Sequence, residues 1–87
     1  MAYTIDFEPK AEAEYKKLDW TTREQVRKFI DRLAQRENPR SIGKSLTGNL
    51  AGLWRYRVGD YRLIARIEDE RLVIVMVRIE HRSKVYR

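Results

Sequence analysis

The feature of this chain that most constrains its fold is a run of alternating apolar and polar residues, from Leu53 to Arg66, interrupted only by Gly59-Asp60. A two-residue interruption that begins with glycine is typical of a β-hairpin turn. The turn sets which residues lie opposite each other, and side chains alternate between the two faces of a sheet. One face of the hairpin is therefore expected to be apolar and aromatic, with Trp54, Tyr56, Val58, Tyr61 and Leu63.

Three arginines are expected on the opposite face of the hairpin, namely Arg55, Arg57 and Arg62. In the register that the turn predicts, Arg57 lies directly opposite Arg62. Like charges in opposing positions destabilise a sheet, and the planar guanidinium group suits bidentate hydrogen bonds to phosphate or carboxylate. We therefore expect the three arginines to bind an anion, either a phosphate or a carboxylate-rich partner. The alternative is a solvated charged surface.

A chain of 87 residues is long enough for one small domain, which we expect to span residues 1–87. The sequence holds no cysteine and a single histidine, which excludes disulfide bridges, thiolate chemistry and a zinc site built from its own Cys and His ligands. We expect no cofactor and no metal site. The lack of cysteine, of a secretory signal at the start and of any stretch long enough to span a membrane favours a cytoplasmic protein without a membrane partner.

The formal charge of +6 is unevenly distributed along the chain. Residues 1–43 hold 9 Lys and Arg against 8 Asp and Glu, whereas residues 44–87 hold 10 against 5. The second half thus carries nearly all of the excess positive charge. A basic surface of this kind raises the local concentration of polyanions and favours nucleic acid as a partner.

The residues before the hairpin predict one strand and two helices. Residues 3–7 alternate with period two, and Pro9 then suits the first turn of a helix. A second helix is expected to start at a capping box in residues 21–24 and to run to about Arg36, with an apolar stripe along one side. Asn38-Pro39 ends it, because the residue before a proline is pushed out of the helical region.

Residues 40–52 hold three of the four glycines and predict an ordered loop, which Leu46 and Leu50 attach to the core. After the hairpin, residues 72–79 are apolar on both faces, as is typical of a central strand. The expected order is β-α-α-β-β-β. It describes an α+β fold in which two N-terminal helices pack on one face of a curved, mainly antiparallel four-stranded sheet. The pattern leaves open which edge of the sheet takes the first strand.

The chemistry that this surface could support is the cleavage of RNA. If alternation continues through the last strand, His81 lies on the same face as the three arginines. Fixed cations stabilise the charge that develops on a phosphate, and His81 or Tyr86 could transfer protons. Such cleavage needs no metal, because the ribose 2′-hydroxyl is itself the nucleophile. Arg66 and Arg78 are interpreted as surface or ion-pairing residues.

Five segments spread over nearly the whole chain carry a family resemblance. They are the start, Met1-Ala2-Tyr3 with Asp6-Phe7, then Lys17-Leu18, Arg23-Glu24-Gln25, Gly59-Asp60-Tyr61-Arg62-Leu63, and the closing His81-Arg82-Ser83-Lys84-Val85-Tyr86. Together they resemble the RelE branch of the RelE/ParE toxin superfamily. The Tyr-Arg-Leu that follows the turn and the terminal His-Arg-x-x-Val-Tyr are specific as a pair.

The resemblance implies a RelE-like fold and a toxin of a type II toxin–antitoxin pair. Such a toxin cuts messenger RNA in the ribosomal A site, in contact with 16S ribosomal RNA, and is neutralised by a RelB-like antitoxin. It is expected to be a monomer within that complex. His81 or Arg82 would replace the C-terminal basic residue of the family, because Glu80 stands at the matched position. The candidate catalytic residues that the resemblance implies are Arg55, Arg57, Arg62, His81, Arg82 and Tyr86.

Two other functions remain open at this point. The first is a ParE-like toxin that inhibits DNA gyrase without nuclease activity, since the two branches share a fold. The second is a non-catalytic basic module whose arginines only hold an acidic partner. A gyrase poison would induce the DNA-damage response and leave messenger RNA intact, and a binding module would be harmless when expressed.

Overall fold

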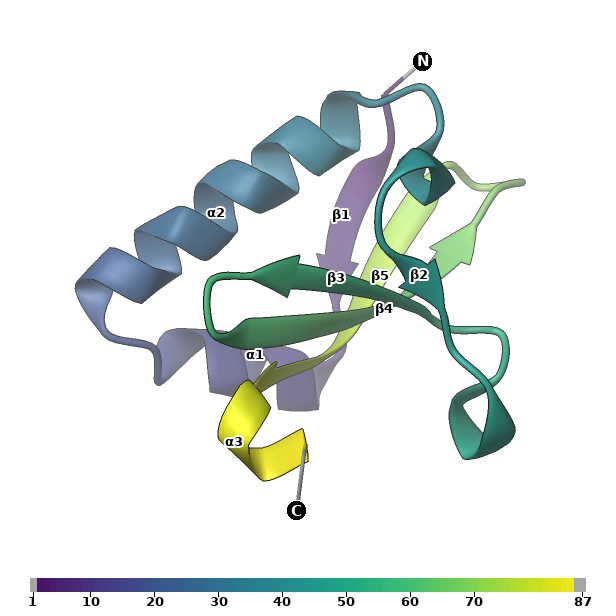
Figure 1. Ribbon diagram of the computed structural model, residues 1–87. Coiled ribbons are helices and arrows are strands. Elements are labelled where there is room, and N and C mark those ends of the chain that lie inside the picture. Colours follow the sequence, from purple (N-terminus) through teal and green to yellow (C-terminus); the bar gives the residue numbers. More distant parts are fainter. Residues whose placement is uncertain (1, 86–87) are drawn as a thin grey trace.

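The structure, a computed structural model, describes residues 2–85 and the side chains of residues 2–83. Its N-terminal part consists of the strand β1 (Thr4–Phe7) and the helices α1 (Pro9–Lys16) and α2 (Trp20–Gln35) (Figure 1). The expected first strand and the start of the first helix at Pro9 are confirmed. The second helix ends one residue before the predicted Arg36.

The second helix begins earlier than predicted. Its cap is Asp19, whose carboxylate accepts a hydrogen bond from the Thr22 N–H at 3.3 Å, and Trp20 is already helical. The predicted capping box in residues 21–24 was therefore wrong. Aspartate is as good a cap as threonine, so two acceptable caps lay two residues apart in the sequence, and the one that starts the helix sooner is used.

The segment between α2 and the hairpin is more regular than an ordered loop. It contains the 3₁₀ helices η1 (Pro39–Ser41) and η2 (Gly48–Leu50) and, between them, the two-residue strand β2 (Lys44–Ser45). Leu46 and Leu50 were expected to attach it to the core, but both are half-buried and lie outside the core cluster of the described residues. Ile42 packs against that cluster instead.

Two aromatic side chains of the hairpin hold this segment in place. The Trp54 Nε1–H donates to the Ile42 carbonyl at 2.7 Å, and the Tyr56 hydroxyl donates to the Pro39 carbonyl at 2.6 Å. Gly43 passes so close to the hairpin, at a φ of +80°, that a Cβ there would lie 2.4 Å from the Arg55 carbonyl oxygen. Glycine is required at this crossing, and the contact brings β2 beside the hairpin.

The sheet is completed by β3 (Trp54–Val58), β4 (Tyr61–Glu68) and β5 (Val73–His81), and a one-turn helix α3 (Arg82–Val85) follows. The strand order is β1-β5-β4-β3-β2, with β1 parallel to β5 and the other pairs antiparallel. The predicted α+β fold, the central position of the last strand and the antiparallel meander are confirmed. The short strand β2, which the sequence did not predict, makes the sheet five-stranded, and the parallel pairing of β1 with β5 makes it mixed.

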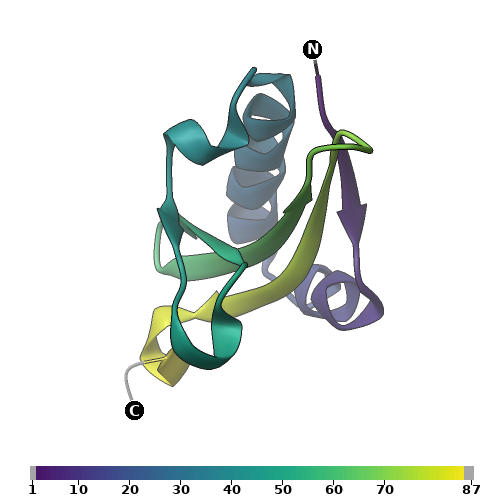
Figure 2. The same ribbon diagram turned by 90° about the vertical axis from the view of Figure 1, so that its right-hand side faces the viewer.

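Both helices pack on the same face of the sheet, and the core lies between them and the strands. Figure 2 shows how strongly β4 and β5 curve in front of α2. The fully buried side chains at the centre include Val26 and Leu33 of α2 and Tyr56, Leu63 and Met76 of the sheet. The aromatic face predicted for the hairpin is thus the face that α1 and α2 cover, and the opposite face of the hairpin is not covered by these two helices.

Candidate nucleic-acid interface

The hairpin has the register that its turn predicts. Val58 pairs with Tyr61, and Arg57 lies directly opposite Arg62. Arg55 pairs with Ile64 one step further from the turn on the same face. The expectation that Arg55, Arg57 and Arg62 share the face away from the helices is therefore confirmed, and we call this the arginine face.

A β-bulge in the last strand changes which of its residues join that face. Ile64 pairs with Arg78, but the next residue, Ala65, pairs with Met76, so that Val77 is the extra residue. Beside the bulge, the Glu14 carboxylate of α1 accepts a hydrogen bond from the Ile79 N–H at 2.8 Å. Because side chains alternate along a strand, one extra residue exchanges the two faces for everything that follows it.

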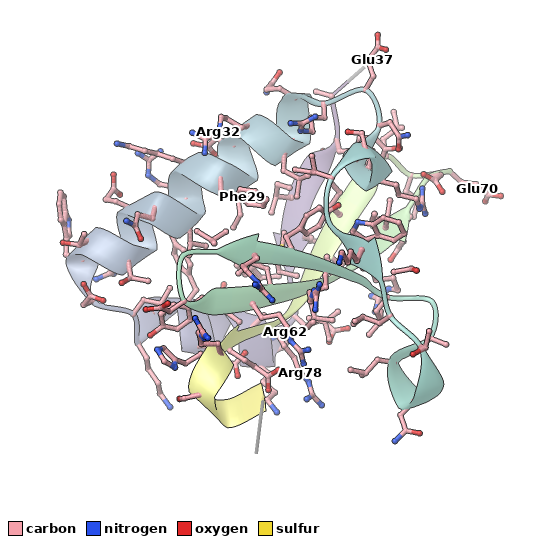
Figure 3. All side chains as sticks on the ribbon, viewed as in Figure 1. Phe29, Arg32, Glu37, Arg62, Glu70 and Arg78 are labelled. Atoms are coloured by element: carbon pink, nitrogen blue, oxygen red, sulfur yellow. The ribbon has the colours of Figure 1, made fainter. Side chains whose placement is uncertain are left out.

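The exchange places Arg78 and Glu80 on the arginine face. Arg62 pairs directly with Glu80 across the two strands, and its Nη2 lies 3.6 Å from a carboxylate oxygen of Glu80. The other carboxylate oxygen lies 3.6 Å from Nη1 of Arg78. Figure 3 shows Arg62 and Arg78 close together near α3. Arg78 is ion-paired as the sequence suggested, but within the arginine face.

Glu80 is thus an internal counter-anion of the arginine face, and sequence reasoning missed it. Its side chain and that of Arg62 are each 20% exposed. Both contacts of the carboxylate are longer than a good charged hydrogen bond of about 2.8 Å, and the buried Nε of Arg62 has no hydrogen-bond partner among the described residues. The carboxylate offsets part of the repulsion between Arg57 and Arg62, and its contacts at 3.6 Å leave the terminal nitrogens of Arg62 and Arg78 without a close charged hydrogen bond to it.

The remaining two arginines of the trio border a depression at the outer edge of β3. Its volume is about 500 Å³, and Lys44, Arg55, Arg57 and Phe29 are among the residues that line it. Arg57 is exposed and Arg55 is half-buried. The arginine face is therefore continuous with the edge of the sheet, where cations from β2 and β3 meet.

The predicted placement of His81 was wrong because of the bulge. His81 pairs with Tyr61, on the face that the helices cover, and the two rings meet edge to face with centroids 5.1 Å apart. Its Nδ1 accepts a hydrogen bond from the Ser83 N–H at 3.1 Å and lies 2.8 Å from the Ser83 hydroxyl. A side chain that accepts from the first turn of a helix is a cap, so His81 holds the start of α3.

The other C-terminal candidates have different positions. Arg82 is exposed, and its Nη1 lies 3.8 Å from a carboxylate oxygen of Asp60, while its backbone N–H donates to the Asp60 carbonyl at 2.8 Å. These contacts attach α3 to the hairpin turn. In the sequence, this turn lies between Arg57 and Arg62. Tyr86 lies outside the described residues.

Tyr56 has the structural role that its place on the apolar face predicts. Burial raises the pKa of Tyr56 to about 12, and its hydroxyl already donates to the Pro39 carbonyl. The ring packs against Phe29 of α2, with centroids 5.6 Å apart. Although Tyr56 borders the depression beside Arg55 and Arg57, a phenol that holds its proton so firmly is not a general base.

Comparison with known proteins shows to which family the chain belongs. Residues 5–86 match the family model described as the ParE toxin of the type II toxin–antitoxin system parDE. The chain is 38% identical to Toxin RelG of Mycobacterium tuberculosis over 87 residues, which cover 100% of this chain and 99% of that protein. It is 32% identical to the mRNA interferase toxin RelE of Escherichia coli, over 99% of this chain and 92% of that protein. The chain belongs to the RelE/ParE toxin superfamily, in its RelE-type branch.

Solved structures of RelE-type toxins have the same fold as this member of the family. The toxin–antitoxin complex RelBE2 of M. tuberculosis contains a chain that matches with a TM-score of 0.85 and 34% identity, over 95% of this chain and 94% of that one. The isolated E. coli RelE toxin matches with a TM-score of 0.77 and 28% identity, over 98% and 92%. Among residues 2–85, no helix is long and apolar enough to cross a membrane.

Proposed function

We propose that this RelE-type chain is the toxin of a type II toxin–antitoxin system and an endoribonuclease that cuts messenger RNA in the ribosomal A site. The observation that carries the proposal is the register that brings Arg55, Arg57 and Arg62 onto one face of the sheet, in a chain related to a protein named mRNA interferase toxin RelE. Relatives crystallised as RelBE complexes support a RelB-like antitoxin as its partner. We place the protein in the cytoplasm, where it would meet both the antitoxin and messenger RNA on the ribosome.

In the proposed reaction the ribose 2′-oxygen attacks the adjacent phosphorus and the bond to the 5′-oxygen breaks. The products are a 2′,3′-cyclic phosphate and a free 5′-hydroxyl. The 2′-hydroxyl loses a proton, the phosphate gains negative charge on its non-bridging oxygens, and the leaving 5′-oxygen takes up a proton. Preorganised cations stabilise the charge that develops in the transition state.

Arg57 and Arg62 are proposed to hold the scissile phosphate between them. They lie opposite each other on neighbouring strands, so one anion can accept hydrogen bonds from both, and bringing an anion there removes the repulsion between the two cations. Arg55 extends the same row of charge. Glu80 competes with the incoming phosphate for Arg62 and Arg78, since its carboxylate lies 3.6 Å from each.

The C-terminal residues are proposed to complete the site, with Tyr86 in proton transfer and Arg82 as a further contact to the substrate. Arginine keeps its proton at physiological pH, so the trio supplies charge and hydrogen bonds but does not donate protons. Because His81 faces away from the arginines, we assign it the positioning of α3, which leads to Tyr86, in place of proton transfer.

The test is expression in cells with and without Arg62→Ala or Tyr86→Phe, read as growth arrest and as mapped cleavage of messenger RNA on translating ribosomes. The unaltered chain should stop growth and cut within the A-site codon, and both variants should lose these effects. Arg71→Ala is the matched control, because Arg71 is an exposed, ion-paired arginine in the turn between β4 and β5. Undiminished toxicity in both variants would reject the assignment.

A gyrase-directed toxin is the competing function, since the matching family model is named for ParE. It would induce the DNA-damage response and leave messenger RNA intact in the same experiment. A purely binding protein would not arrest growth, with or without these substitutions. Its arginine variants would lose only the binding of the acidic partner.

A further inference from the structure

A second basic surface lies between α2 and the outer edge of β3. The depression of about 500 Å³ described above continues into another of about 360 Å³, because Phe29 and Arg57 line both. We call the two together the edge groove. Lys28 and Arg32 line its second part, and Figure 3 shows Phe29 reaching from α2 toward β3 with Arg32 on the same helix.

The edge groove concentrates positive charge without acidic side chains. Its cations are Lys28, Arg32, Lys44, Arg55 and Arg57, and no Asp or Glu lines either depression. Seven other arginines of the described part of the chain have a carboxylate within 4.0 Å, namely Arg27, Arg40, Arg62, Arg66, Arg71, Arg78 and Arg82, whereas Arg23 and Arg36 form no salt bridge with a described residue. Lys28, Arg32, Lys44 and Arg55 form no salt bridge with a described residue.

This difference points to a polyanion as the occupant. Clustered cations repel one another, and a groove lined by one sign of charge attracts ligands of the opposite sign. A single strand of nucleic acid offers both evenly spaced phosphates and base planes that stack on aromatic rings. Phe29 supplies such a ring at the junction of the two depressions, half-buried and braced against Tyr56.

RNA is favoured over an acidic peptide because the edge groove shares Arg57 with the arginine face. A strand whose scissile phosphate lies between Arg57 and Arg62 has its neighbouring phosphates within reach of the cations around Arg57. The binding of an acidic peptide in the groove would not require contact with Arg57.

We propose that the edge groove binds the segment of substrate RNA that flanks the cleaved bond. Its phosphates contact Lys28, Arg32 and Lys44, and one base packs against Phe29. This inference rests on the proposed function and extends it from the cleaved phosphate to a binding track between β3 and α2.

The test compares two purified double variants of the full chain. Lys28→Gln with Arg32→Gln removes two charges from the edge groove, and the matched control, Lys16→Gln with Arg71→Gln, removes one lysine and one arginine from exposed ion pairs elsewhere. Binding of a fluorescent 2′-O-methyl RNA strand of about 10 nucleotides is measured by anisotropy at several salt concentrations. The methyl group blocks the nucleophile, so binding is read without cleavage.

Each phosphate contact on a single strand contributes about 0.7 to the slope of log affinity against log salt. The groove variant should therefore lose about 1.4 of that slope, while the control keeps the slope of the unaltered chain. Equal slopes in both variants would overturn the inference. Retained RNA binding together with lost binding of the cognate antitoxin in the groove variant would overturn it too, because the groove would then be a protein interface.

Ribosomal cleavage separates this inference from the proposed function. If the unaltered chain cuts messenger RNA and the groove variant keeps its full salt slope, only the edge groove is refuted. If the unaltered chain neither binds the RNA strand nor cuts messenger RNA, the proposed function fails and the edge groove with it. A groove variant that keeps its melting temperature but cuts messenger RNA more slowly than the control supports the track.

Discussion

The two ends of the sheet use arginine in opposite ways. At the end near the β4–β5 turn, Arg40 is 2.9 Å from Asp69, Arg66 is 3.1 Å from both Glu8 and Glu68, and Arg71 also pairs with Glu68. At the other end, Arg57 faces Arg62 directly, and the Glu80 carboxylate is shared at 3.6 Å between Arg62 and Arg78.

The difference separates arginines that are closely paired within the chain from Arg62 and Arg78, which share one carboxylate at a longer distance. Close, paired arginines have their donors directed at carboxylates of the same chain, so a further anion gains little from them. The long contacts of the shared Glu80 carboxylate leave the guanidinium donors of Arg62 and Arg78 incompletely used. A phosphate at hydrogen-bond distance can bind these donors more strongly than Glu80 does. The following variants test whether this distinction holds.

The largest effect is expected from Arg62→Ala on cleavage. Removing one preorganised donor from a site of developing negative charge costs about 100- to 1,000-fold in rate, so cleavage of ribosome-bound messenger RNA should fall by about that factor. Thermal stability should be retained or rise, because the repulsion with Arg57 disappears while Glu80 keeps Arg78. If Arg62→Ala instead lowered the melting temperature and left the cleavage rate of the folded protein unchanged, Arg62 would serve stability and not the substrate.

Tyr56→Phe should affect stability more than RNA binding. It leaves the buried Pro39 carbonyl without its 2.6 Å hydrogen bond, at a cost of about 1–3 kcal/mol in the free energy of unfolding, which denaturant titration would measure. The salt slope for RNA should stay unchanged, because the ring that braces Phe29 is kept.

The pKa of Tyr56 gives the same residue a pH signature. Its folded pKa, raised to about 12 by burial, exceeds the ordinary value near 10. The stability that its protonated hydroxyl contributes is fully present below pH 10 and is lost as pH rises through 12. Ultraviolet titration of the folded chain should show one tyrosine that ionises last, and Tyr56→Phe should remove it.

Glu80→Gln should tighten RNA binding. The substitution removes the negative charge that competes with phosphate for Arg62 and Arg78 but keeps the side-chain shape. For a partly exposed pair, an interaction of about 1 kcal/mol corresponds to roughly a fivefold gain in affinity for the 2′-O-methyl RNA strand. Glu68→Gln is the control from the paired end. Weaker binding in Glu80→Gln would show that the carboxylate orients Arg62 for the substrate.

Asp69→Asn should give the smallest effect, and only on stability. The hydrogen bond from Arg40, aided by one from the Tyr3 hydroxyl, lowers the pKa of Asp69. A depressed carboxyl pKa stabilises the fold above the unfolded pKa, and this contribution disappears as pH falls through the folded value. Asp69→Asn should flatten the decline of melting temperature between pH 5 and about pH 3, while RNA binding is unchanged.

The resemblance and the fold could be predicted because their signals are local. The Gly59-Asp60 turn sets the pairing from Val58 and Tyr61 outward, so the placement of Arg57 opposite Arg62 follows by counting. Pro9 marked the first helix for the same reason. Where two local signals competed, as with Asp19 and Thr21 as caps of α2, the sequence could not decide between them.

What the sequence could not determine lies in the last strand and at the edge of the sheet. Residues 72–79 are apolar on both faces, so no alternation reveals the bulge at Val77 that turns Glu80 toward the arginines and His81 away. The edge groove joins α2 to β3, which lie far apart in the chain. A turn is specified by the residues that form it, whereas a bulge and a groove depend on how separate elements pack, and that packing exists only in the folded chain.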